Sequence, residues 1–161
     1  MAFTNRLVSD STSAGRSIEL APQWREELLG RRDELCGSSF RDATVGICAL
    51  MAAADGSIDP NERHRAAQLL GADLLLQHFP ADELRNLFED NCARLSMDPA
   101  FGRAYVMQQI AKSTGNPAEA RAVVQIAIML SNTEGRFDTH EIAAVREACQ
   151  VLHLNPSEFG L

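Results

Sequence analysis

The fold is decided by residues 45–62, which read VGICALMAAADGSIDPNE. The first half, through Ala54, is apolar nearly all round, which is typical of a helix covered on several sides. The second half favours a turn and a new helix, because Asp59 can cap a helix and Pro60 suits its first turn. The stretch therefore predicts a buried helix, a tight turn and a second helix.

Start signals of the same kind recur along the chain and predict seven helices. Their expected starts are at or near Pro22, Phe40, Asp59, Pro80, Asp98, Asn116 and Asp138. The second is expected to run from Phe40 to Ala54, and Gly71 is expected to end the third. Aromatic residues are only 6% of the chain and no segment reads as a strand. The sequence predicts an all-α antiparallel bundle of about seven helices.

The 161 residues fit one domain with a real core. Residues 1–21 are rich in small polar residues and are interpreted as a flexible N-terminal arm. Residues 22–161 form the single helical domain.

The net charge of the chain indicates which classes of partner it can bind. The chain has 22 acidic and 15 basic residues, a formal net charge of −7. This field argues against nucleic acid and favours cations or a basic protein surface. No signal peptide is visible, and the longest apolar run, residues 47–54, is too short to span a bilayer. We expect a cytoplasmic protein without a transmembrane segment.

The four cysteines, Cys36, Cys48, Cys92 and Cys149, contain no Cys-x-x-Cys pair. A zinc knuckle or a dithiol redox centre therefore has no support. We expect all four to lie in helices as small, mostly buried side chains.

One pattern occurs twice, at residues 55–62 (DGSIDPNE) and 79 residues later at 134–141 (EGRFDTHE). Val45 and Ile47 match Val124 and Ile126 at the same offset. Each copy predicts a buried helix, an acid-Gly turn and a capped second helix. The chain is thus predicted to contain two pseudo-symmetric helical-hairpin repeats.

Each copy reproduces only the second half of a calcium-binding EF-hand loop. The two leading ligand places fall on Met51 and Ala53 in the first copy and on Leu130 and Asn132 in the second. Hydrocarbon cannot coordinate a hard cation. Neither copy is therefore a complete EF-hand.

Two interpretations of the repeated acids stay open. If the turns pack side by side, six carboxylates would share one face and could hold a divalent cation (Ca²⁺, Mg²⁺, Mn²⁺ or Zn²⁺) or a basic partner. These candidate metal ligands are Asp55, Asp59, Glu62, Glu134, Asp138 and Glu141. Alternatively, the Asp and Glu pairs are capping boxes and both glycines are left-handed turn residues. Capping leaves Asp55 and Glu134 without a structural role.

The paired acid-Gly-x-apolar-Asp-x-x-Glu turns, together with the C-terminal segment NPSEFGL (155–161), resemble the TerB domain of bacterial tellurite-resistance and stress-response operons. The resemblance covers residues 39–161. It implies an all-α bundle of two related halves that binds metal through the acidic turns. It also implies a cytoplasmic complex with other tellurite-resistance proteins at the inner face of the membrane. Glu134 stands where the family usually has Asp, and its longer side chain changes the ligand geometry there.

The leading hypothesis is a stress-response binding module with a divalent-cation site between its two turns. The alternative is a metal-free structural adaptor for protein–protein interaction. Phosphate-binding glycine loops, nucleophile elbows and paired redox thiols are absent as motifs, so we expect no enzymatic activity.

Overall fold

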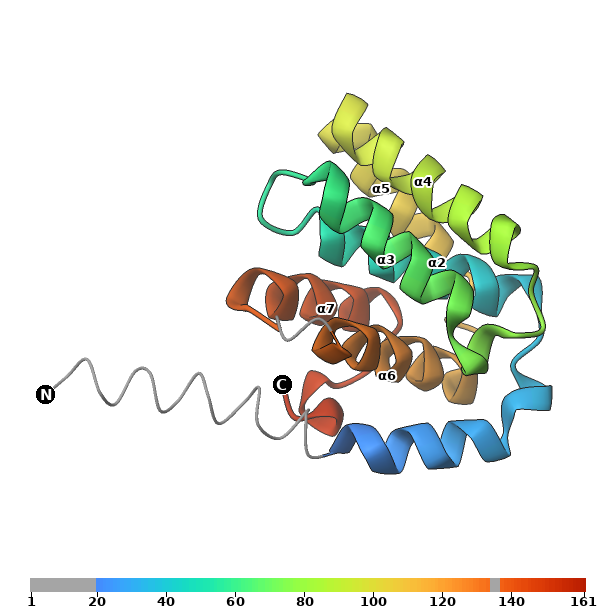
Figure 1. Ribbon diagram of the computed structural model, residues 1–161. Helices are drawn as coiled ribbons and strands as arrows, with labels where there is room; N and C mark the ends of the chain where they lie inside the picture. Colours follow the sequence, from blue (N-terminus) through green and yellow to red (C-terminus); the bar gives the residue numbers. More distant parts are fainter. Residues whose placement is uncertain (1–19, 134–136) are drawn as a thin grey trace, which may run out of the picture.

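The computed structural model describes residues 20–133 and 137–161, which form seven α-helices and three short 3₁₀ helices (Figure 1). The first α-helix covers residues 20–30. The others are α2 (Ser38–Ala52), α3 (Pro60–Ala72), α4 (Ala81–Met97), α5 (Pro99–Ala111), α6 (Pro117–Thr133) and α7 (Thr139–Val151). The 3₁₀ helices are η1 (Arg32–Glu34), η2 (Leu74–Leu76) and η3 (Pro156–Phe159). No strand occurs in these two ranges, which confirms the predicted all-α bundle.

Some predicted boundaries were wrong. Helix α2 begins and ends two residues earlier than expected, and α3 passes through Gly71 to end at Ala72. The first helix is already formed at Leu20, so Pro22 lies inside it. Of the predicted flexible arm, residues 1–21, all but Leu20 and Ala21 lie outside the described part of the chain.

Helix α2 is the centre of the bundle and contacts α3, α4, α5, α6 and α7. Its residues 43–47 are all buried, as predicted for a helix covered on several sides. Close packing requires small residues there: a Cβ on Gly46 would lie 3.3 Å from Cγ1 of Ile110 in α5. In α6, Val124 and Ile126 are fully buried, as are their predicted counterparts Val45 and Ile47 in α2.

Four helix starts are capped as the sequence predicts. Asp59 Oδ1 accepts from the N–H of Asn61 at 2.7 Å, and Asp98 Oδ1 accepts from that of Phe101 at 3.2 Å. Asn116 and Asp138 cap α6 and α7 in the same way, through the N–H groups of Glu119 and Glu141 at 3.2 and 2.9 Å. These local hydrogen bonds fix where each helix begins.

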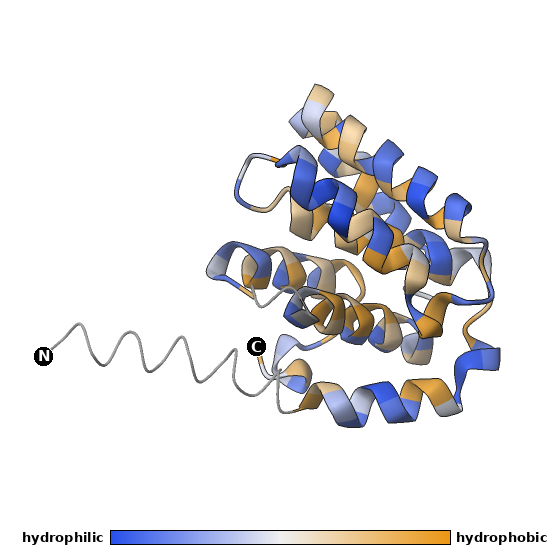
Figure 2. Ribbon diagram, in the orientation of Figure 1, coloured by the Kyte–Doolittle hydropathy of each residue, from blue (hydrophilic) through white to orange (hydrophobic). Residues whose placement is uncertain are grey.

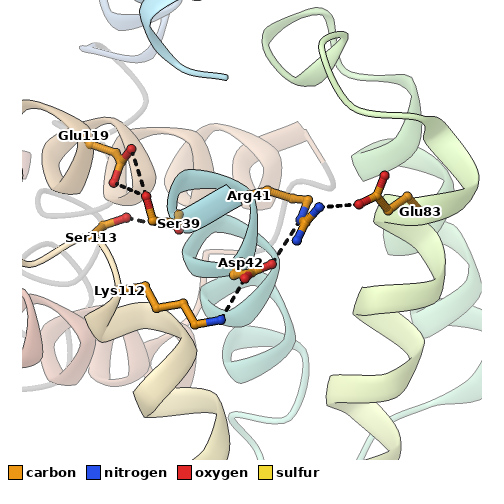
Figure 3. A network of polar contacts seen from close by, with 7 residues as sticks. All are labelled: Ser39, Arg41, Asp42, Glu83, Lys112, Ser113 and Glu119. Atoms are coloured by element: carbon orange, nitrogen blue, oxygen red, sulfur yellow. Dashed lines mark hydrogen bonds and ion pairs between the residues drawn. The ribbon is translucent and has the colours of Figure 1, made fainter. Parts of the chain in front are cut away.

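A polar network anchors the N-terminal end of α2 (Figure 3). The Ser39 hydroxyl donates to the buried Glu119 carboxylate at 3.1 Å, and the Ser113 hydroxyl donates to the Ser39 carbonyl at 3.3 Å. Asp42 accepts from Lys112, just after the end of α5, at 2.8 Å and from its neighbour Arg41 at 3.0 Å. Arg41 also pairs with Glu83 of α4 (Figure 3). Side chains of α4 and α6, together with Lys112 and Ser113 in the loop after α5, therefore hold one end of the central helix.

The first helix packs against the C-terminal segment (Figure 1). Trp24 is buried and meets the ring of Phe159 edge-on at 6.2 Å between centroids. Arg25 forms an ion pair with Asp73 at 3.3 Å, beyond the end of α3. The two ends of the described chain are thus joined in one core.

Figure 2 shows hydrophilic residues along the visible faces of α3 and α4 and many hydrophobic residues in α6. Two large apolar side chains at the α4–α5 corner stay in solvent, with Met97 86% and Phe101 78% exposed. Within the described ranges, no helix is long and apolar enough to cross a membrane.

Gly102 allows α5 to turn back tightly against α4. A Cβ built on it would lie 2.3 Å from the backbone oxygen of Arg94. Because backbone cannot move aside as a side chain can, we expect Gly102→Ala to lower the free energy of unfolding by at least about 3 kcal/mol. Urea unfolding followed by circular dichroism measures this loss.

Gly30→Ala is the matched control, because a Cβ there meets nothing within 4 Å. It should cost no stability, since alanine favours a helical position. Equal stability of the two variants would contradict the tight α4–α5 packing.

Candidate functional site

The first acid-Gly turn and the start of α7, which ends the second copy of the repeat, line one cavity. The first turn joins α2 to α3, and Figure 1 shows this turn toward the same end of the molecule as the start of α7. The cavity of about 170 Å³ is lined by the end of α2, by α3, by the end of α6 and by the start of α7. We call its four acidic lining residues, Asp55, Glu62, Asp138 and Glu141, the acidic mouth.

Four of the six predicted metal ligands therefore line the same cavity. Asp59 is not among the residues that line the cavity, and its described contacts are those of a helix cap. Glu134 and the predicted turn glycine Gly135 lie outside the described residues. His140 lines the cavity beside Asp138 and Glu141.

The first turn is shaped by Gly56, whose φ of +90° is left-handed, as predicted. The Asp55 carboxylate accepts from the N–H of Ser57 at 3.1 Å. This hydrogen bond is an Asx turn, which gives Asp55 the structural role that the sequence did not reveal. Asp59 then starts α3, so Asp55 and Glu62 flank a turn whose backbone is fixed.

The end of α6 and the start of α7 are joined by a contact that the sequence did not signal. The Ser131 hydroxyl, near the end of α6, donates to the Glu141 carboxylate in the first turn of α7. Nearby, Asn132 has both polar side-chain atoms buried, without a hydrogen-bond partner among the described residues. An unpaired buried amide is uncommon in a folded protein.

The hydrogen bonds from backbone N–H groups use only part of the acceptor capacity of Asp55 and Asp138. Asp55 and Asp138 each accept their backbone N–H groups through Oδ1. An ionised carboxylate offers two oxygens and about four acceptor positions. A structural role and a ligand-binding role are therefore compatible in the same residue.

The oxygen donors suit Ca²⁺, Mg²⁺ or Mn²⁺ in kind but do not form a ready-made site. Among residues 20–133 and 137–161, no three His, Cys, Asp or Glu side chains are grouped closely enough to hold a metal ion. The described carboxylates alone thus do not fit a preassembled metal centre.

Behind the acidic mouth, the cavity has an apolar floor, which we define as Met51, Ala52, Ile58, Ala66 and Leu130. Two arginines also line the cavity. Arg63 is bound to the Glu89 carboxylate and donates to its carbonyl at 3.0 Å, whereas Arg65 is exposed on α3. The residues of the apolar floor are buried or half-buried, whereas Asp55, Glu62 and Asp138 are exposed.

The cysteines are mostly as expected. Cys92 and Cys149 are buried and Cys48 is half-buried in the cavity wall, but Cys36 lies exposed in the loop before α2, so its predicted helical position was wrong. Burial raises the pKa of Cys48, Cys92 and Cys149 to about 12 in each case. These three residues therefore stay thiols at neutral pH.

We predict that only Cys36 reacts rapidly with a disulfide reagent such as dithiobis(nitrobenzoate) at pH 8. With a pKa of about 12, the other three thiols have about one thiolate in 10,000 molecules. Unfolding in guanidinium should release all four. Rapid modification of two or more thiols in the folded protein would contradict this burial.

No curated protein and no solved structure matches this chain. The sequence model of the family described as "Tellurite resistance protein TerB" matches residues 41–161. The match begins within α2 and runs to residue 161, and it includes both copies of the repeated pattern and all residues of the acidic mouth. The chain therefore belongs to the TerB family.

Proposed function

We propose that this TerB-family chain is a binding module for tellurite resistance whose binding face is the acidic mouth, with a divalent cation as its ligand. The observation that carries the proposal is the shared cavity: Asp55 and Glu62 reach it from the first turn, Asp138 and Glu141 from the second. A positive ligand between them would offset their mutual repulsion.

A cation here would act by joining the two turns. Because the described side chains are not grouped as a metal site, binding requires them to reorient or requires a further ligand. Glu134, the first residue of the second copy, is one candidate, and the unpaired amide of Asn132 is another. The expected ions are Ca²⁺, Mg²⁺ and Mn²⁺, with Zn²⁺ favoured only if His140 takes part.

The module would work in a cytoplasmic complex with other tellurite-resistance proteins, at the inner surface of the membrane. We propose no catalytic activity, because the one cysteine among the described residues of the wall, Cys48, is held as a thiol. An acidic surface also repels the tellurite anion itself.

Calorimetric titration of chelator-treated protein with Ca²⁺, Mg²⁺, Mn²⁺ and Zn²⁺ tests the proposal. We expect saturable binding of at least one ion in the parent protein. In the double variant Asp55→Asn/Glu134→Gln, affinity should fall at least tenfold, because both turns lose a charged ligand while the helices stay formed.

Asp98→Asn is the matched control, because Asp98 caps α5 as Asp138 caps α7 but does not line the cavity. It should leave ion binding unchanged. Flat traces for all four ions would refute the cation and leave the metal-free adaptor. An equal loss in Asp98→Asn would place the ion elsewhere.

A further inference from the structure

The corner where α4 ends and α5 begins carries the two most exposed large apolar side chains of the described residues. Met97 is 86% and Phe101 78% exposed, whereas Phe40, Phe88 and Phe159 are fully buried. Both exposed side chains line a surface hollow of about 380 Å³. Large apolar side chains that gather at one exposed place mark interaction surfaces, unlike those that are scattered singly.

The corner is built rigidly, so the exposure of its side chains is a fixed feature of the fold. Asp98 caps α5 by accepting from the N–H of Phe101 at 3.2 Å. A Cβ on Gly102 would meet the backbone of Arg94, so the two helices are in direct contact beside the hollow. A surface that is already ordered loses little conformational freedom when it binds a partner.

The hollow offers apolar and aromatic contacts to a large side chain. Ala93 and Tyr105, both half-buried, line it together with Gly102. The guanidinium of Arg94 lies over the Tyr105 ring, 4.0 Å from its centroid, and Arg94 Nε donates to the Asp90 carboxylate at 2.9 Å. These two contacts hold the Arg94 side chain in place beside the ring.

The patch is complementary to itself in shape and in charge. Exposed Met97 and Phe101 lie next to a hollow with room for a phenyl ring. Arg94 shares the hollow with two acids, Asp90 and Asp98. In the described hydrogen bonds Arg94 uses only Nε and Asp98 only Oδ1, so each can form a further bond. Because both signs of charge are present, the patch favours a second copy over a strongly charged partner.

We propose that the α4–α5 corner is the interface of a twofold homodimer, in which Phe101 of each copy enters the hollow of the other. A twofold axis places the same patch on both sides of an interface, and here it brings Arg94 of one copy beside Asp98 of the other. A stable interface buries about 800 Å² on each partner, and two large apolar side chains supply only part of that area. The dimer is therefore weak. It does not involve the acidic mouth or a bound cation.

Sedimentation equilibrium of chelator-treated, reduced protein between about 10 µM and about 500 µM tests this inference. We expect the weight-average mass to rise from that of one chain toward that of two. Isotope-filtered NMR on mixed labelled and unlabelled chains should show contacts between the Phe101 ring of one copy and the Ala93 methyl group of the other. A mass that stays that of one chain at the highest concentration would overturn the proposal.

Phe101→Glu removes the inserted ring without weakening the start of α5. Phe101 is the third residue after the Asp98 cap, a position where glutamate is favoured. We expect dimerisation at least about tenfold weaker, with an unchanged circular dichroism spectrum.

Leu74→Glu is the matched control, because Leu74 is an exposed apolar residue of η2 that does not line the hollow. It adds the same charge to the chain and should dimerise as the parent protein does. A dimer that survives Phe101→Glu, or that Leu74→Glu weakens equally, would place the interface elsewhere and overturn the proposal.

Discussion

The structure depends on the burial of α2 on nearly every side. A helix covered by five others cannot carry charge along its middle, so residues 43–47 contain only small, apolar or hydroxyl side chains. Close approach adds a second restriction, since Gly46 leaves no free space toward Ile110. Charged groups are therefore displaced to the two ends of this helix.

The two ends of α2 are built differently. At the N-terminal end, the polar groups pair with one another. Glu119 accepts a hydrogen bond from Ser39, and Asp42 accepts hydrogen bonds from Lys112 and Arg41 (Figure 3). At the C-terminal end, the acids outnumber the bases around an open cavity. Such an excess has a cost in repulsion unless a positive ligand is bound, and this cost is the reason for proposing the second end as the binding face.

Features that depend on neighbouring residues could be predicted from the sequence. The caps at Asp59, Asp98, Asn116 and Asp138 follow from side chains that bond to backbone two or three residues on. The left-handed Gly56 follows from its place after a helix. Offset matching also predicted that Val45, Ile47, Val124 and Ile126 are buried in helices.

Features that depend on tertiary packing could not be predicted. The Ser131–Glu141 and Arg63–Glu89 contacts join residues with no spacing signal. Gly102 resembles a helix-weakening residue until α4 is seen against it. The sequence could not predict that both copies of the pattern line one cavity, because no residue of one turn specifies where the other turn lies.

The central claim is that the two turns share one opening, and paramagnetic relaxation in solution tests it most directly. A nitroxide on Ser57→Cys, in a Cys36→Ser background, labels the first turn while the buried thiols stay unmodified. The account predicts strong broadening of the amide signals of Thr139, His140 and Glu141 at the start of α7. Broadening confined to α2 and α3, with the α7 signals unchanged, would contradict it.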